Sequence, residues 1–410
     1  MRRLSAFLGL DRAVAYTVLW RSWSALVAPV TLVLVATFLS PVAQGFFYTF
    51  SSIAALQVIF ELGLSQLILQ FTSHERSRLH WEPDGRLGGD RHAWSRLASL
   101  LRSALRWYAT AAVLVVAVLL PAGLRLFATR AAEAASLEWA LPWTLFVVLS
   151  AGSFALLPVV AVVEGCGRVA DVALMRLTQT ILANGAMWLV LLLHGGLYAL
   201  VAIRAVDVGW TLAWLLTRHR GLLADLLAPG RRPVETVSWR REIWPLQWRT
   251  ALVWASSAFI TPLFNPILFA FHGAAEAGRM GLSVSIVTAI NAVGLAWVQT
   301  KAPAFGVLVA RRQFAELDRL FFPALAKSAV VVLASCLVVL AVTARLAATG
   351  HPLAARILPP IPLVLLLATA VVLHVIYAEA VYLRAHKAEP FVAVAVVASL
   401  LTGSASWLLG

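Results

Sequence analysis

The sequence is poor in charged residues. Asp, Glu, Lys and Arg together make up 13% of its 410 residues, about half the share of roughly 25% that is usual in soluble domains. Hydrophobic residues make up 61% of the chain. This composition excludes an ordinary soluble domain. It predicts an all-α polytopic membrane protein, because backbone groups in lipid must be satisfied within helices.

Cysteine and catalytic motifs are also scarce. Cys166 and Cys336 form no CxxC pair, which argues against a disulfide framework or a cysteine metal site. Three histidines lie among acidic residues in the stretch 72–98, but their spacing matches no compact metal-ligand motif. We interpret this stretch as a solvated loop and expect no metal site. A catalytic triad, a P-loop and paired carboxylates are missing too, so we do not expect an enzyme.

Long apolar runs are what the sequence has instead, and each reaches roughly the 20 residues that a membrane-spanning helix needs. The first run, residues 13–39, is too long for a cleaved signal peptide and predicts a first spanning helix that is retained. An odd number of spans would place Gly410 on the outer side, and we expect a twelfth helix to be missing from the sequence. Hydropathy predicts eleven spanning segments: 13–39, 43–71, 104–127, 139–163, 170–194, 196–217, 247–272, 279–302, 321–345, 358–383 and 390–409.

The net charge of +14 would suit nucleic acid, but no DNA- or RNA-binding motif accompanies it. Basic residues instead gather in alternate loops between the predicted segments, so we expect no nucleic-acid partner. By the positive-inside rule this alternation places the N-terminus in the cytoplasm. The densest groups are Arg76, Arg78, Arg86, Arg91 and Arg96 after the second segment and Arg218, Arg220, Arg231, Arg232, Arg240 and Arg241 after the sixth.

A weak internal repeat divides the chain. Trp20-Arg21 begins the first half and Trp248-Arg249 begins the second, and Gln44-Gly45 and Ala277-Gly278 follow at similar distances. Such repeats are typical of transporters built from two related bundles. We therefore predict two pseudo-symmetric six-helix bundles. Residues 1–220 form the first, 221–246 a cytoplasmic linker with an interfacial segment, and 247–410 the second, with five helices visible.

Ionisable and amide side chains inside the apolar segments predict a cavity between the two bundles, because lipid does not solvate them. Alternatives remain open for some of them. Arg21 and Arg249 could snorkel to the interface, and Arg204 and Asp207, three residues apart, could neutralise each other. The predicted substrate-binding residues are Arg21, Gln57, Glu61, Arg176, Gln179, Arg204, Asp207, Arg249, Asn291 and Lys301.

Three runs resemble the polysaccharide (O-antigen-type) flippases of bacteria. LSPVAQGFFYTFSSIAALQVIFELGLSQLILQF resembles their first helical hairpin, VVEGCGRVADVALMRLTQTI the join of their fourth and fifth helices, and GAAEAGRMGLSVSIVTAINAVGLAWVQTKAPAFG their seventh-to-eighth hairpin. These flippases belong to the multidrug/oligosaccharidyl-lipid/polysaccharide exporter superfamily. The resemblance implies at least twelve helices in two bundles, around a cavity that opens alternately to either side.

From the resemblance and the basic excess we expect a flippase. Its substrate would be a polyprenyl-pyrophosphate-linked oligosaccharide, crossing the bacterial cytoplasmic (inner) membrane. Arginine suits such a substrate because its planar fork matches phosphate. We expect no cofactor, with a coupling proton or sodium ion left open, and polysaccharide polymerase and glycosyltransferases as partners. One alternative is a cation-coupled exporter of drugs or organic ions with the same fold. Another, ranked lower, is a membrane glycosyltransferase, which would need a larger first outer loop with acids.

Overall fold

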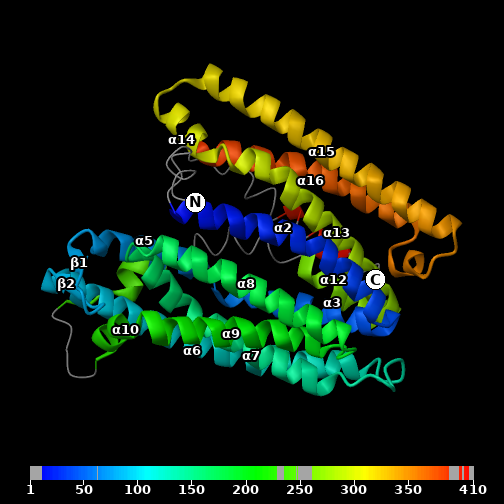
Figure 1. Ribbon diagram of the computed structural model, residues 1–410, viewed down its shortest axis with the longest axis horizontal. Helices are drawn as coiled ribbons and strands as arrows, with labels where there is room; N and C mark the ends of the chain where they lie inside the picture. Colours follow the sequence, from blue (N-terminus) through cyan, green and yellow to red (C-terminus); the bar gives the residue numbers. More distant parts are fainter. Residues whose placement is uncertain are drawn as a thin grey trace. The chain divides into compact units, whose positions relative to one another are not determined.

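A computed structural model describes residues 12–61, 63–228, 235–245, 247, 261–386, 397–398 and 401–405 (Figure 1). The chain forms two compact units. Unit 1 joins Met1–Ser24 to Phe50–Pro262, and unit 2 joins Ala25–Thr49 to Leu263–Gly410. The tip of the first helical hairpin therefore belongs to unit 2, although unit 1 precedes and follows it in the sequence.

Unit 1 is a helical bundle with one small hairpin of strands. Helix α6 lies along α7 and helix α8 lies along α9, and α7 also contacts α5 and α9. Its elements are the start of α2 (Arg12–Phe38), the end of α3 (Pro41–Ala55), α4 (Val58–Glu61), α5 (Leu64–Arg76), β1 (Leu79–Trp81), β2 (Leu87–Gly89), α6 (Arg91–Ala128), α7 (Ala140–Gly165), α8 (Val169–Leu192), α9 (Tyr198–Arg218), α10 (Arg220–Leu227) and the π-helical turn η1 (Trp239–Ile243).

Unit 2 contains the other long helices. Helices α13, α15 and α16 contact one another pairwise, and the short α14 contacts α15 and α16. Besides residues 25–38 of α2 and 41–49 of α3, its elements are α12 (Thr261–His272), α13 (Ala274–Gln299), α14 (Ala302–Ala310), α15 (Phe314–Ala348), the 3-10 turn η2 (Pro352–Arg356) and α16 (Pro360–Ala385).

Eight helical stretches in the described residues are long and apolar enough to cross a membrane, one of them Pro41–Glu61, which takes α3 and α4 together. The prediction of an all-α polytopic membrane protein is confirmed. Much of the predicted segments 247–272 and 390–409 lies outside the described residues. The division of the chain at 1–220, 221–246 and 247–410 stays a prediction.

The second predicted segment, 43–71, is interrupted: a candidate span runs from Pro41 to Glu61, but the predicted continuation of the same helix to residue 71 is wrong. Helix α3 ends at Ala55, and the backbone then turns through bonds of the 3-10 type, such as Gln57 N–H to Ala54 O at 3.1 Å. The helix is interrupted a second time at Gly63. The φ of Gly63 is 68°, a left-handed conformation that glycine adopts at little cost. The apolar composition persists across both interruptions, so hydropathy does not reveal them.

The stretch 72–98 is more ordered than the predicted solvated loop. Strands β1 and β2 pair antiparallel, with Leu79 opposite Gly89. Leu79 and Leu87 are buried, and the Trp81 Nε1–H donates to the Cys166 carbonyl at 3.0 Å. The prediction is wrong for these strands, because β1 packs on α5, β2 packs on α6, and Trp81 bonds to the residue that follows α7.

Arg96, near the start of α6, ties the end of the predicted linker to unit 1. Its guanidinium lies 2.8 Å from Glu75, 3.1 Å from Glu235 and 2.7 Å from Glu242. Hydrogen bonds from Arg96 and from the Ser238 backbone N–H hold the pKa of Glu242 below its usual range. Three carboxylates on one guanidinium thereby fix residues 235–243 to helices α5 and α6.

Candidate functional site

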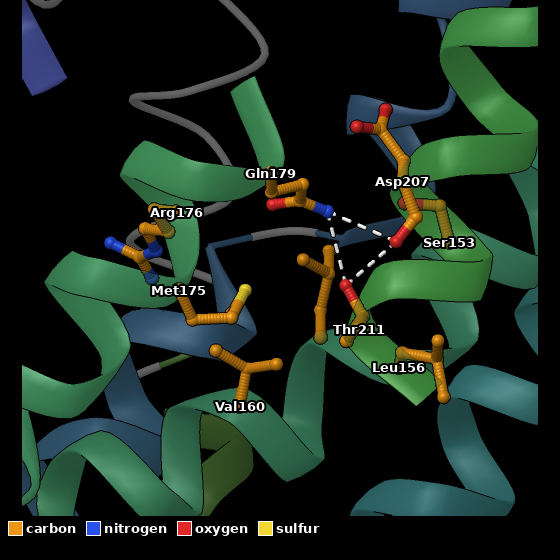
Figure 2. Close-up of a pocket in the computed structure, with 9 residues that line it drawn as sticks. Ser153, Leu156, Val160, Met175, Arg176, Gln179, Asp207 and Thr211 are labelled. Atoms are coloured by element: carbon orange, nitrogen blue, oxygen red, sulfur yellow. Dashed lines mark hydrogen bonds between the residues drawn. The ribbon is translucent and has the colours of Figure 1, made fainter. Parts of the chain in front are cut away.

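Helices α7, α8 and α9 line an open pocket of about 180 Å³ in unit 1 (Figure 2). Each helix presents residues spaced three or four apart, which places them on one face. Drug-sized ligands occupy pockets of roughly 300–1,000 Å³, so this one suits a small polar group. Its lining consists of Ser153, Leu156, Leu157 and Val160 from α7, Met175, Arg176 and Gln179 from α8, and Asp207 and Thr211 from α9.

Gln179 joins α8 to α9 across this pocket. Its Nε2 donates to the Asp207 carbonyl oxygen and to the Thr211 Oγ1, both at 3.0 Å. Thr211 Oγ1 in turn donates to the same Asp207 carbonyl at 2.7 Å, and Figure 2 shows the three bonds as a triangle. The triangle fixes the amide side chain through the Asp207 backbone, so that the Asp207 carboxylate can pair with Arg204.

Arg176 pairs with a carboxylate that the sequence analysis did not select. One of its terminal nitrogens lies 2.9 Å from the Glu164 Oε2 near the end of α7. The guanidinium carbon also lies 5.9 Å from the centre of the Trp20 ring, and the Trp20 Nε1–H donates to Thr180 at 3.1 Å. A carboxylate and an aromatic face therefore hold Arg176, while 39% of its side chain remains exposed.

Arg204 pairs with Asp207 one turn along α9. Its Nη1 lies 3.1 Å from the Asp207 Oδ2, and its guanidinium carbon lies 5.7 Å from the Phe146 ring. The Arg204 Nε–H is buried and has no hydrogen-bond partner among the described residues. Two arginines and two carboxylates thus balance in charge around the pocket, with at least one N–H donor left over.

The predicted site residues are only partly brought together. Arg176, Gln179 and Asp207 line the pocket, and Arg204 reaches it through Asp207. Glu61 lies elsewhere in unit 1 and accepts a hydrogen bond from Ser65, as their shared face predicts. Gln57 lies in the turn before α4.

Four further candidates are not among the described residues that line this pocket. Asn291 lies within α13, and Lys301 precedes α14, so both belong to unit 2. Arg21 lies in α2, but its side chain is outside the described part of the structure, as is the whole of Arg249. The assignment of these residues to a substrate cavity stays a prediction.

The predicted site residues do not include Glu164, Thr211 or Trp20. Glu164 is the acid of the VVEGCGR run, just before its Gly-x-Gly turn. Thr211 follows Asp207 by four residues, and this spacing is the signal in the sequence that points to it. Trp20 stands beside Arg21 in the repeat, where it was read as a marker of the repeat.

The sequence and the structure of the chain were compared with those of known proteins. No family model matches the sequence, and no curated protein matches it. The structure is similar to a multidrug resistance MATE family transporter of the MOP superfamily in its inward-facing conformation. That likeness has a TM-score of 0.54 and 15% identity, and covers 94% of this chain and 93% of the other. The chain has the fold of the MATE transporters.

A second similar structure is an outward-facing conformation of a multidrug resistance MATE family transporter. It has a TM-score of 0.45 and 14% identity, covering 98% of this chain and 95% of the other. The first of these structures is described as a transporter of the MOP superfamily, and at 15% identity the likeness is one of fold. The narrower assignment to the flippases stays a prediction.

Proposed function

We propose that this protein is a flippase for a polyprenyl-pyrophosphate-linked oligosaccharide or a related lipid-linked glycan. The observation that carries the proposal is the pair of arginines at the α7–α8–α9 pocket inside an apolar bundle. Arginine is costly there, and its fork of N–H donors matches phosphate oxygens. Cation–carboxylate pairing alone would not explain the buried, unpartnered Nε–H of Arg204.

The substrate phosphate would exchange with the carboxylates that now hold the arginines. Each guanidinium has five N–H donors. Arg176 gives Glu164 one close contact and keeps more than a third of its side chain exposed. A phosphate arriving at Arg176 would meet donors already oriented by Glu164 and Trp20, which lowers the entropic cost of binding.

The size of the pocket limits what it holds. About 180 Å³ is room for one phosphate group and a few waters, each of roughly 30 Å³, but not for an oligosaccharide. The glycan would therefore occupy a wider cavity, and the polyprenyl tail would stay in the bilayer. Alternating access, with the bundles rocking against each other, would carry the headgroup across.

The proposal includes a setting. The protein would lie in the cytoplasmic (inner) membrane of a bacterium with its N-terminus in the cytoplasm. It would act beside the glycosyltransferases that complete the lipid-linked glycan and the polymerase that consumes it. It would perform no covalent chemistry and need no cofactor, and a proton or sodium gradient would drive it.

An exporter of organic cations is the second candidate, and one observation favours it. Glu164 and Asp207 balance both arginines, so the pocket is not cationic overall, and Trp20 offers an aromatic face for a cation. In this case the carboxylates, rather than the arginines, would bind the substrate.

Removing the charge of Arg176 in one variant and of Glu164 in another distinguishes a flippase from an exporter of organic cations. The full chain, reconstituted in liposomes, would be assayed with a fluorescent polyprenyl-pyrophosphate sugar and separately with a fluorescent organic cation. A flippase predicts that Arg176→Gln slows glycan movement at least tenfold, whereas Glu164→Gln, which keeps the guanidinium but loosens its orientation, slows it by a smaller factor. Arg125→Gln, at the exposed end of α6, is the control. Wild-type glycan movement in folded Arg176→Gln would refute the flippase assignment, and loss of cation movement in Glu164→Gln would support the exporter.

A further inference from the structure

The turn η1 and the tryptophan that follows it have two different sides on the surface of unit 1. Val237 and Ile243 are 9% and 1% exposed and belong to the large hydrophobic cluster of this unit. Arg240 and Arg241 lie between them in the sequence and are exposed, and Trp244 is 46% exposed. One side of the turn therefore packs into the bundle, and the other presents two consecutive arginines and an indole ring to the surroundings.

A stacked pair of tryptophans sets the depth of this turn in the membrane. The Trp239 ring of η1 stacks on the Trp107 ring of α6, with ring centres 5.9 Å apart and an interplanar angle of 25°. Arg106 is the last charged residue of α6 before an uncharged run that extends to Leu124. Trp107 thus lies where the membrane-spanning part of α6 begins, and the stacking places η1 at the same level. Tryptophan and arginine are both typical of this boundary between hydrocarbon and water.

The exposed side of the turn carries positive charge. The carboxylate of Glu242, which follows the two arginines, accepts hydrogen bonds from Arg96 at 2.7 Å and from the Ser238 backbone N–H at 2.8 Å. The other two carboxylates of the Arg96 cluster are held by the same guanidinium. Arg240 and Arg241 form no ion pair with the described residues. Each brings five N–H donors in a planar arrangement that matches phosphate oxygens.

We propose that Arg240, Arg241 and Trp244 bind the headgroup of an anionic phospholipid in the leaflet that the basic loops face. The phosphate oxygens accept hydrogen bonds from the two guanidinium groups, and the indole ring lies at the level of the headgroups. Unpaired positive charge, an exposed aromatic ring and the depth of the membrane boundary coincide on this one turn. The site is separate from the α7–α8–α9 pocket, and the inference does not depend on which substrate the protein carries.

The Arg96 cluster prepares the turn for a lipid. Because Arg96 fixes residues 235–243 to α5 and α6, a headgroup does not have to order the linker when it binds, which lowers the entropic cost of binding. An acidic segment of a soluble protein would match the charge of the two arginines. It would not provide the apolar boundary that the exposed Trp244 and the stacked Trp107 and Trp239 favour, so a lipid fits this surface better.

Quenching of Trp244 by brominated phospholipid tests the contact. The full chain would be reconstituted in phosphatidylcholine nanodiscs that contain a minor fraction of brominated phosphatidylglycerol or, separately, of brominated phosphatidylcholine. The fluorescence of the wild type minus that of Trp244→Phe isolates this residue from the other tryptophans, of which the chain has 16 in total. We expect brominated phosphatidylglycerol to quench the difference signal at a mole fraction at least tenfold lower than brominated phosphatidylcholine, and added salt to narrow this gap.

Variants of the arginines distinguish a specific site from general attraction to a basic surface. Each basic residue near an anionic membrane contributes roughly fivefold in affinity, so Arg240→Gln/Arg241→Gln should reduce the preference for phosphatidylglycerol at least tenfold. Arg240→Lys/Arg241→Lys keeps the charge and should retain most of the preference. The matched control is Arg311→Gln/Arg312→Gln, which removes two exposed consecutive arginines between α14 and α15 of unit 2 and should behave like the wild type.

Three results would overturn the proposal. The first is equal quenching of the wild type by the two brominated lipids. The second is a loss of preference in Arg311→Gln/Arg312→Gln as large as in Arg240→Gln/Arg241→Gln, because the attraction would then belong to the whole basic surface. The third is a Trp244 signal that responds to a soluble acidic peptide but not to phosphatidylglycerol, which would assign the turn to a protein partner. The readout requires no transport, so it is independent of the Arg176→Gln assay.

Discussion

At the scale of single residues, the arginines in unit 1 are held rather than free. Each has a carboxylate within hydrogen-bonding distance, Arg176 with Glu164 and Arg204 with Asp207. The sequence left open whether Arg204 and Asp207 neutralise each other or line a cavity. In the structure they do form a pair, and Asp207 also lines the pocket. Pairing with a carboxylate neutralises each arginine and so permits its insertion into the membrane. The exposed part of each arginine side chain can still contact a substrate.

Removing one partner of the Arg204–Asp207 pair should therefore be costly. In Asp207→Asn the Arg204 guanidinium, 32% exposed, loses its counter-charge, and we expect a loss of roughly 1–3 kcal/mol. The double variant Arg204→Leu/Asp207→Leu should recover most of it, because no unpaired charge remains. Thermal unfolding in detergent measures both, and a double variant less stable than Asp207→Asn would contradict the assignment.

His219, just after α9, should make stability depend on pH. Burial lowers the pKa of its ring below the usual histidine value, against a smaller opposing effect of the Asp171 carboxylate. The folded state thus prefers the neutral ring, whose contribution is complete above the unfolded pKa of about 6.5 and is lost as the pH falls below it. Melting temperatures between pH 8 and pH 5 should fall less steeply in His219→Gln than in the wild type, and equal slopes would exclude this role.

At the scale of elements, α3 and α13 meet through backbone. Gly45 and Gly278 are counterparts in the internal repeat, and the structure places them against each other in unit 2. A Cβ on Gly45 would overlap the Ala274 carbonyl, and one on Gly278 would come within 2.9 Å of the Gly45 nitrogen. The Gln44 Nε2–H donates to the Gly278 carbonyl at 2.8 Å. Small residues commonly allow membrane helices such close contact.

A single methyl group should disrupt this seam. Gly45→Ala should destabilise the protein by roughly 1–3 kcal/mol, the usual cost of overpacking, although alanine favours a helix. Gly185→Ala in the exposed face of α8, where a Cβ would meet nothing within 4 Å, is the control and should be neutral or stabilising by about 0.5–1 kcal/mol. Thermal unfolding of both variants checks this. Equal behaviour would mean that the close contact does not exist.

The helices could be predicted from the sequence, but their interruptions could not. Hydropathy located α2, α7, α8, α9, α13 and α16 within a few residues, because lipid exposure demands continuous apolar runs. The polar ends of helices were harder to predict from hydropathy. Helix α6 begins at Arg91, well before its apolar part, and the Asp90 side chain caps it by accepting a hydrogen bond from the His92 backbone N–H. The left-handed Gly63 interrupts an apolar run whose composition gives no warning.

At the scale of the whole molecule, contacts between distant segments were the hardest to predict. Arg176, Gln179 and Asp207 were predicted because they are polar residues inside apolar segments, and they do line one pocket. Polar side chains avoid the lipid-facing side of a helix, so they face the interior of the bundle. The same criterion also selected Asn291 and Lys301, which lie in unit 2, because polarity does not say which helices are neighbours. The assignment of residues 25–49 to unit 2 depends on packing such as that at Gly45, which no local pattern encodes.

Orientation in the membrane is a property of the whole chain, and paired cysteine variants test it. Ser77 follows α5 next to several arginines, whereas Ser136 lies in the turn between α6 and α7, and both are exposed. The two native cysteines are buried, which keeps background labelling low. Because basic loops stay in the cytoplasm, a membrane-impermeant maleimide added to intact cells should label Ser136→Cys and leave Ser77→Cys unlabelled until the membrane is opened. The reverse pattern would invert the topology and place the N-terminus outside.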